Sequence, residues 1–284
     1  MSIRIVADSS SDAESIDDER LTVLPLTVML DGKSYLDRVD LTSQEFYEKI
    51  ERTHEVPKTS QVNPFAYHEV FQAAHNAGEE VICICLSSTV SGTYESACNA
   101  AKEVGGDIYV VDSRQIAMGT NIQVHYALRM ADQGFHAKEI AEELNSTKDR
   151  IHMIAAVDTL EYLRRSGRAP NVIAFVGDKL NIKPLFTLDN GRPKLIGKAP
   201  GWKACYRNFA KNMYVKTNVD FSKPICFAYT GLDNGRLMKY MEQTRNYWHK
   251  YIPDDELNIT LAGSTIGTHV GPGAIGVAYY TKSV

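Results

Sequence analysis

The chain has 284 residues, of which 44% are hydrophobic and 23% are charged, and its formal net charge is -4. This length suits two compact cores better than one, and the composition is typical of a soluble globular protein. The weak negative charge provides no basic surface, which argues against binding to nucleic acid or to an anionic membrane. No segment approaches the ~18 apolar residues of an integral membrane span, and the first apolar stretch is too short for a signal peptide.

The five cysteines form no C-x-x-C pair, and Cys83 and Cys85 lie within the apolar run VICICL. Cysteines embedded in apolar segments are typical of reduced core residues, whereas a metal site needs several ligands at short, regular spacing. We therefore expect a cytoplasmic protein that holds neither disulfides nor a metal ion.

In the first half, short strand-like runs alternate with helical segments, which is the pattern of a parallel sheet covered by helices. Three such runs end at clusters of serine and aspartate: IRIVA (3–7), VICICL (81–86) and IYVV (108–111).

Three helices are predicted in this half from apolar residues at helical spacing. The first covers 64–78, with Asn63 as its N-cap and Gly78 as its stop. The second covers 92–103 and is expected to bury Tyr94, Ala97, Cys98 and Ala101. The third covers 136–148 and is expected to bury Ala137, Ile140, Ala141 and Leu144.

Near residue 150 the pattern changes, and we divide the chain into two α/β domains, residues 1–150 and 151–284. The second begins with a predicted strand, a short helix that stops at Gly167 and a more apolar helix over 171–181. A hairpin is expected over 184–197, because Asn190-Gly191 accepts the positive φ angles of a two-residue turn. A helix, the strand PICFAYTG, another helix and two final strands follow, which gives a sheet with antiparallel pairing.

Gly271, Gly273 and Gly276 have the G-x-G-x-x-G spacing of a dinucleotide-binding loop. That function needs a helix after the loop and an acidic residue about 20 positions further on. The residues that follow, VAYY, are β-branched or aromatic and predict a strand, so the nucleotide interpretation fails. What remains is a loop that carries His269 and has the backbone freedom to approach a ligand closely.

Ser91 lies in LSSTVSGTYESA (86–97), after the carboxyl end of a predicted strand, where open α/β sheets bind ligands. Its position suits a helix N-cap beside Gly92, which lets an anion approach free backbone N–H groups. An ordinary capping serine explains the same residue without any ligand. Thr59, in the loop KTSQ (58–61), offers a second hydroxyl.

His269 fits three roles. No cluster of further ligands supports a metal site. A catalytic base for Ser91 would make the protein a hydrolase, but no G-x-S-x-G motif surrounds that serine. A hydrogen bond to an anionic ligand, held from the other side by Ser91 and Thr59, needs only one anion between two domains. Arg164, Arg165 and Arg168 either assist such a site or are solvated charges at a helix end.

The chain resembles the DegV family, whose motifs appear in order over residues 3–282: ADSSSD, KTSQ, LSSTVSGTYESA, VDS, DTLEYLRRSGR and GTHVGPGAIG. Family members include the fatty-acid-binding (FakB) subunits of bacterial fatty acid kinase. The resemblance implies a two-domain α/β fold, a mostly parallel sheet followed by a mixed one, with one long-chain fatty acid between the domains and no cofactor. It also implies a non-catalytic partner of a separate ATP-using kinase subunit, which makes acyl phosphate for phospholipid synthesis.

On this resemblance, the residues around the fatty acid carboxylate are Thr59, Ser91, His269 and Arg168, with backbone support from Gly92 and Gly271. The candidates for lining the acyl chain are Ile173, Phe175 and Phe186, for which plain core packing is an equal alternative. The competing hypothesis is a lipid hydrolase or acyltransferase that uses Ser91 and His269.

Overall fold

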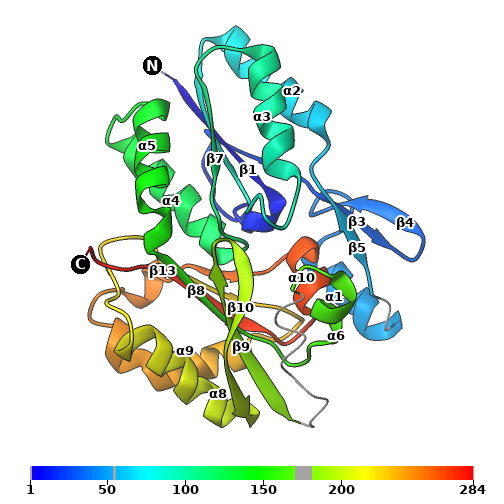
Figure 1. Cartoon of the computed structure of the whole chain (residues 1–284), viewed down its shortest axis with the longest axis vertical. Helices are drawn as coiled ribbons and strands as arrows, with labels where there is room; N and C mark the ends of the chain where they lie inside the picture. Colours follow the sequence, from blue (N-terminus) through cyan, green and yellow to red (C-terminus); the bar gives the residue numbers. More distant parts are fainter. Residues whose placement is uncertain (1, 54–55, 170–180, 284) are drawn as a thin grey trace.

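The computed structural model describes residues 2–53, 56–169 and 181–283, and it contains two large sheets and one small sheet (Figure 1). The first large sheet has the strand order β2-β1-β6-β7 and is parallel throughout. Its strands are β1 (Ile3–Asp8), β2 (Leu21–Leu24), β6 (Glu80–Cys85) and β7 (Ile108–Asp112).

Helices cover both faces of this sheet because its strands are apolar on both sides. Ile82 and Ile84 pack with helices α4 (Met118–Asp132) and α5 (Ala137–Thr147), whereas Val81 and Cys83 pack with α2 (Pro64–Ala77) and α3 (Thr93–Val104). Alternate side chains of a strand point to opposite faces, so one continuous apolar run fills two cores. The predicted parallel sheet is confirmed.

The second large sheet has the strand order β10-β9-β8-β13-β11-β12, with only the β11–β12 pair parallel. Its strands are β8 (Ile151–Ala156), β9 (Ile182–Asp189), β10 (Arg192–Pro200), β11 (Cys226–Tyr229), β12 (Ile259–Leu261) and β13 (Ile275–Tyr280). Helices α8 (Gly201–Ala210), continued by a π-helical turn (Lys211–Val215), and α9 (Gly235–Trp248) cover its outer face. The mixed second sheet is confirmed, and all its strands lie after the predicted division at residue 150, which stays a prediction.

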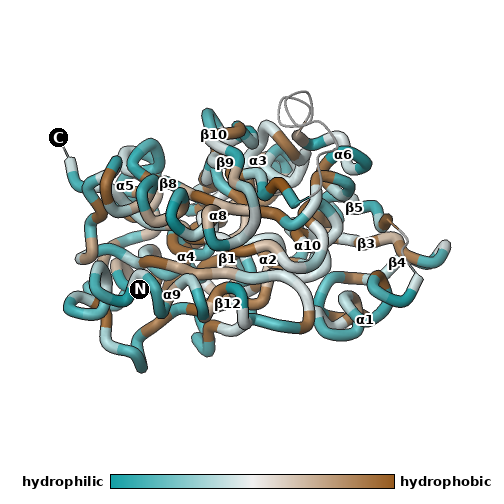
Figure 2. Tube along the Cα trace, turned by 90° about the horizontal axis from the view of Figure 1, so that it is seen from below, coloured by the Kyte–Doolittle hydropathy of each residue, from teal (hydrophilic) through white to brown (hydrophobic). Residues whose placement is uncertain are grey.

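The inner face of the second sheet packs against α4, α6 (Glu161–Ser166) and α10 (Ser264–Val270). Helix α4 also contributes to the core of the first sheet, so it lies between the two sheets (Figure 1). In the view from below, hydrophobic segments gather toward the centre of the molecule, whereas hydrophilic segments lie mainly on loops and helices at its periphery (Figure 2). None of the helices within the described residues is both long enough and apolar enough to cross a membrane.

A small antiparallel sheet, β4-β3-β5, was not predicted. It consists of β3 (Thr27–Leu30), β4 (Lys33–Leu36) and β5 (Lys58–Ser60), and it packs with α1 (Ser43–Thr53). The remaining short elements are 3-10 turns at Ser9–Ser11, Lys148–Arg150 and Asp254–Glu256.

Several local predictions are confirmed. Helix α2 has Asn63 as its N-cap and Gly78 in the left-handed C-cap position. The turn between β9 and β10 has positive φ angles at Asn190 (47°) and Gly191 (78°), as a two-residue hairpin turn requires. Gly167 ends α6 with a φ of 69°. In α5, the four predicted apolar residues are buried.

Three predictions need correction. Helix α3 begins at Thr93 with Gly92 as its N-cap, so Ser91 lies one residue before the cap. The buried residues of α3 are Thr93, Ser96, Ala97 and Ala100, so of the four predicted residues only Ala97 is buried. The buried face of the helix is therefore rotated from the face that its apolar residues predict. His269 lies in the last turn of α10 rather than in the glycine loop, which begins after it. The predicted helix over 171–181 and the residues Ile173 and Phe175 fall on the part of the chain outside the described residues.

Candidate functional site

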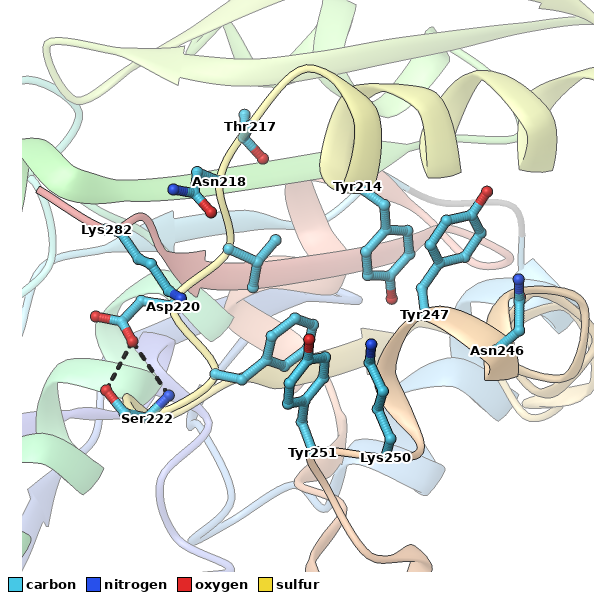
Figure 3. A pocket seen from close by; sticks show the side chains of 12 residues that line it. Tyr214, Thr217, Asn218, Asp220, Ser222, Asn246, Tyr247, Lys250, Tyr251 and Lys282 are labelled. Carbon is cyan, nitrogen blue, oxygen red and sulfur yellow. Dashed lines mark hydrogen bonds between the residues drawn. The ribbon is translucent and has the colours of Figure 1, made fainter. Parts of the chain in front are cut away.

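Two sizeable cavities compete as the functional site. The larger, about 660 Å³, lies beside α9 and the segment after the π-helical turn (Figure 3), and none of the predicted site residues that the structure describes lines it. Its aromatic rings stack on one another, Tyr214 on Tyr247 and Phe221 on Tyr251, and its acid Asp220 already accepts from Ser222. The rings and Asp220 therefore have partners within the wall, and the second cavity, which holds the predicted site residues, is the stronger candidate.

The second cavity, about 520 Å³, lies between the two large sheets and brings together most of the predicted site. Thr59 comes from β5, Ser91 and Gly92 from the loop before α3, and His269 from α10. Arg168, just after α6, and Phe186, on β9, complete the set of predicted residues that line it. Side chains that are distant in the sequence therefore meet around one cavity.

Thr59 and His269 are in direct contact, with 2.9 Å between the threonine Oγ1 and the histidine Nε2. Burial, together with the nearby positive charge of Arg168, lowers the pKa of His269 to about 4. The imidazole is therefore neutral at pH 7. When Nε2 carries its proton, His269 donates to Thr59, and the threonine hydroxyl proton is free to point at a ligand.

The other ring nitrogen of His269, Nδ1, is buried and has no hydrogen-bond partner among the described residues. A buried imidazole with one unsatisfied nitrogen costs free energy, which a hydrogen bond from that nitrogen to a ligand or a bound water would recover.

This environment gives a testable pH dependence. The folded-state pKa of His269 lies below the ordinary value of 6.5, so its neutral form contributes stability above pH 6.5, and this contribution is lost as the pH falls to about 4. We expect His269→Gln to reduce the loss of unfolding free energy between pH 7 and pH 4 by roughly 2 to 3 kcal/mol, as measured by urea denaturation. His249→Gln, at an exposed position, is the matched control for the removal of an imidazole outside the cavity. Parallel curves for the wild type and His269→Gln would show that the buried imidazole does not titrate as described.

Ser91 is held by its neighbour in sequence rather than by His269. Its Oγ accepts from the backbone N–H of Thr93 at 3.2 Å and lies 2.9 Å from the Thr93 hydroxyl. Among the described contacts of His269, the side-chain hydrogen bond goes to Thr59, so a serine–histidine pair is not assembled. Ser91 is nevertheless at the cavity wall, where its hydroxyl can also reach a ligand.

The two glycines proposed as backbone support behave differently. Gly92 lines the cavity, and a Cβ at this position would overlap the side-chain oxygen of Gln61. Gln61 in turn donates to the Ser96 hydroxyl at 2.8 Å, so it braces the start of α3. Gly271 is not among the described residues that line the cavity, and the ring of Tyr162 packs against it instead. Sequence reasoning did not assign a role to Gln61. Its place in the KTSQ motif, two residues after Thr59, was the feature that could have indicated one.

Arg168 lies at the mouth of the cavity, where its side chain is exposed and donates to the Ser166 carbonyl at 2.8 Å. It also lines an adjoining polar cavity of about 310 Å³ together with Arg192. Arg165 instead pairs with Glu161 on the exposed surface of α6, and neither it nor Arg164 lines the described part of the cavity. Of the three arginines considered, the structure brings only Arg168 to the site.

Helix α10, which carries His269, is fixed by carboxylates from distant segments. Asp37 accepts from the backbone N–H groups of Ser264 (3.2 Å) and Thr265 (3.3 Å) and from both hydroxyls. Asp12 accepts from the N–H of Gly263 at 2.8 Å. These bonds satisfy the free N–H groups at the start of the helix, which has no side-chain cap of its own.

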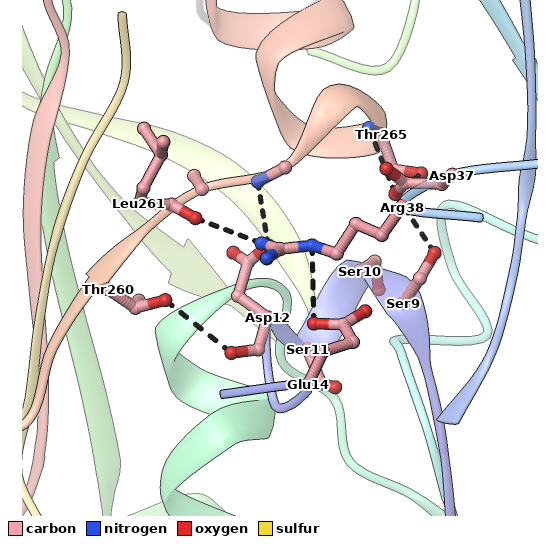
Figure 4. A network of polar contacts seen from close by, with 12 residues as sticks. Ser9, Ser10, Ser11, Asp12, Glu14, Asp37, Arg38, Thr260, Leu261 and Thr265 are labelled. Carbon is pink, nitrogen blue, oxygen red and sulfur yellow. Dashed lines mark hydrogen bonds and ion pairs between the residues drawn. The ribbon is translucent and has the colours of Figure 1, made fainter. Parts of the chain in front are cut away.

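Arg38 joins this network to the second domain (Figure 4). Its guanidinium contacts the Asp12 carboxylate at 2.7 Å and the Leu261 carbonyl at 2.9 Å, and it lies 3.2 Å from Glu14. Burial raises the pKa of Asp12 to about 6 and that of Glu14 to about 8. The ADSSSD motif thus serves to position α10, and sequence reasoning did not identify Asp37 or Arg38.

The fold and the site define a two-sheet α/β protein with an internal cavity whose mouth carries hydroxyl, imidazole and guanidinium groups and whose depth is apolar. The chain belongs to the DegV family: the family model, described as an uncharacterised protein of the DegV family, matches residues 2–282. Within the described residues, no group of three or more His, Cys, Asp or Glu side chains is arranged to hold a metal ion.

Relatives and solved structures agree with this assignment. A DegV domain-containing protein of Caldanaerobacter subterraneus subsp. tengcongensis is 36% identical over 99% of both chains. The structure of a DegV family protein from Thermus thermophilus, described in terms of its fatty acid binding, is 29% identical, with a TM-score of 0.88 over 99% of this chain and 100% of that one. The structure of DegV, a fatty acid binding protein from Bacillus subtilis, is 27% identical, with a TM-score of 0.82 over 99% of this chain and 100% of that one.

Proposed function

We propose that this protein binds one long-chain fatty acid in the cavity between its two sheets and presents the carboxylate to a separate ATP-dependent kinase subunit. The observation that carries the proposal is the contact between Thr59 and His269 in the wall of a cavity that is also lined by apolar side chains such as Leu86, Leu163 and Phe186. Relatives described as fatty-acid-binding proteins support it.

The head-group residues match a carboxylate. The hydroxyls of Thr59 and Ser91 act as donors, and the guanidinium of Arg168 supplies positive charge at the mouth. Hydrogen bonds from such groups to an ionised carboxylate are shorter and stronger than neutral ones, and an unpaired carboxylate would be costly to bury. A bound anion would also offset the effect of Arg168 on His269 and raise the pKa of that histidine.

The tail supplies the affinity. Each buried methylene contributes about 0.8 kcal/mol, so a 16-carbon chain offers roughly 12 kcal/mol before the costs of association. Leu86, Leu163 and Phe186 are among the apolar side chains of the cavity. Phe186 was proposed from the sequence as a residue that lines the acyl chain. It also belongs to the core between the sheets, so it would contact the tail and pack the core at the same time.

The phosphoryl donor would come from the partner. The chain has no G-x-x-x-x-G-K-[ST] phosphate loop, and the head-group site is open toward Arg168 and Arg192 in the adjoining polar cavity. Acyl phosphate made there would enter phospholipid synthesis. All five cysteines have free thiols, which fits the reducing cytoplasm of a bacterium.

Organic extraction of the purified protein followed by mass spectrometry tests the central claim. We expect one long-chain fatty acid per protein molecule, because a tail enclosed by apolar walls dissociates slowly. The control for losses during purification is delipidated protein that is incubated with radiolabelled palmitate and oleate. The radiolabel that this reloaded protein retains is then measured. Failure of both the native and the reloaded protein to retain any fatty acid would contradict the proposal.

The serine-dependent hydrolase or acyltransferase remains the competing function, because Ser91 and His269 line the same cavity. A fluorophosphonate distinguishes the two. Stoichiometric labelling of Ser91 would support the enzyme, whereas an unlabelled protein that carries lipid supports the carrier, since the imidazole bonds Thr59 instead of activating the serine.

A further inference from the structure

A small deep compartment continues the cavity away from the head-group residues. It has a free volume of about 40 Å³, and four apolar residues line both spaces: Ile116, Phe186, Ile266 and Val270. None of the four proposed carboxylate ligands is among the described residues that line it. The compartment therefore extends the cavity on the side away from the head-group residues, where the tail of a fatty acid held at Thr59 and Ser91 would lie.

The floor of the deep compartment is made of small residues on three neighbouring strands. Gly276 of β13 lies opposite Ala155 of β8 and Ala228 of β11, and all three line the compartment. Met118, the first residue of α4, rests on this floor, because a Cβ built at Gly276 would overlap its terminal methyl group.

The backbone that carries Met118 is fixed, whereas its side chain is adaptable. Ala117 has a φ of 48° and a ψ of -128°, a conformation that a non-glycine residue keeps only when its surroundings enforce it. The preceding turn is held by the N–H of Gln115, which donates to the Ser113 hydroxyl at 3.0 Å. The thioether chain of methionine, with three rotatable bonds, is then the movable part of this wall.

We propose that Met118 is the end-stop of the fatty-acid cavity and that Gly276 sets how deep this stop lies, so that the pair selects the length of the acyl chain. The inference rests on the proposed fatty acid function. The compartment adds only about 40 Å³ to the main cavity of about 520 Å³, so it has room for few tail carbons. A longer chain must displace the Met118 methyl, and a shorter one leaves a void beneath it.

Two substitutions at this contact should act in opposite directions. Met118→Ala removes three heavy atoms from the wall, so the bound fatty acids should become longer by roughly two or three carbons. Gly276→Ala pushes the methionine methyl toward the tail, so they should become shorter by roughly one or two carbons. The φ of Gly276 is not positive, so alanine fits the backbone there.

The experiment compares extracted fatty acids by mass spectrometry, together with competition binding of saturated acids from 12 to 22 carbons on delipidated protein. Each methylene gained or lost should change the relative affinity about fourfold. Met241→Ala, a buried methionine of the outer core, controls for a general loss of packing and should leave the profile unchanged. Met118→Leu, close to wild type in volume, should keep the wild-type profile and covers the case in which the alanine variant does not fold.

The outcomes separate the two proposals. If the wild type holds no fatty acid, the proposed function fails. If the wild type binds fatty acid but Met118→Ala and Gly276→Ala leave the chain-length profile unchanged, or shift it in the same direction, the end-stop assignment is overturned and fatty acid binding stands.

Discussion

A protein carrying both Thr59→Ala and Ser91→Ala is expected to fold and retain its fatty acid but to support acyl phosphate formation at least about 100-fold more slowly than the wild type. Each hydroxyl provides a hydrogen bond to a charged carboxylate worth roughly 1.5–3 kcal/mol, and 1.4 kcal/mol corresponds to a factor of ten. The tail, which supplies most of the affinity, is untouched. The measurement is a phosphorylation assay with the cognate kinase, run beside extraction of the bound lipid.

The matched control for this variant is Thr217→Ala with Ser222→Ala. These residues also provide a threonine and a serine hydroxyl to a cavity, but to the larger one beside α9. We expect this control to be phosphorylated at the wild-type rate. Unchanged phosphorylation in the Thr59→Ala/Ser91→Ala protein would refute the assignment of the head-group site.

Replacing Asp37 with alanine should produce the largest loss of stability, roughly 3 to 5 kcal/mol in the free energy of unfolding. The Asp37 carboxylate is buried and accepts five hydrogen bonds, from Ser9 (2.9 Å) and from the N–H and hydroxyl groups of Ser264 and Thr265. The substitution leaves these donors without an acceptor in a dry environment, which costs far more than the loss of an exposed ion pair. Urea denaturation at pH 7 measures the effect.

The control for Asp37→Ala is Asp189→Ala on the exposed hairpin. Asp189 also loses a close partner, Lys194 at 2.7 Å, but both side chains are solvated, so the expected change is below about 1 kcal/mol. If both variants lost the same small amount, Asp37 would not be the residue that anchors α10.

The parts of the fold that could be predicted depend on short-range signals. Asn63 and Gly78 delimit α2 because capping involves only neighbouring residues. Asn190-Gly191 predicts its hairpin because those two residues accept positive φ angles. Continuous apolar runs such as VICICL predict strands covered on both faces, since both sets of alternate side chains must be buried.

The elements that were missed depend on distant partners. Strand β5 has three residues and no periodic pattern, and it exists because β3 pairs with it. Helix α10 has seven residues, mostly small or β-branched, and its first turn is capped by Asp12 and Asp37 rather than by its own side chain. Both elements carry residues of the candidate site, Thr59 and His269. The secondary structure of that site is therefore less predictable from local sequence than the rest of the fold.

By itself, the sequence determined an α/β fold with a parallel sheet followed by a mixed one, the Asn190-Gly191 hairpin turn, the ends of α2 and α6, and a set of motifs that together indicate the DegV family. Only the tertiary structure decided that Thr59 meets His269 across 210 positions of sequence, that Asp37 caps α10 and that Met118 lies on Gly276. The physical reason is that propensity and capping act between neighbours along the chain. The contact of two polar groups instead requires that the entropy of closing long loops be offset by burial of the cores around them.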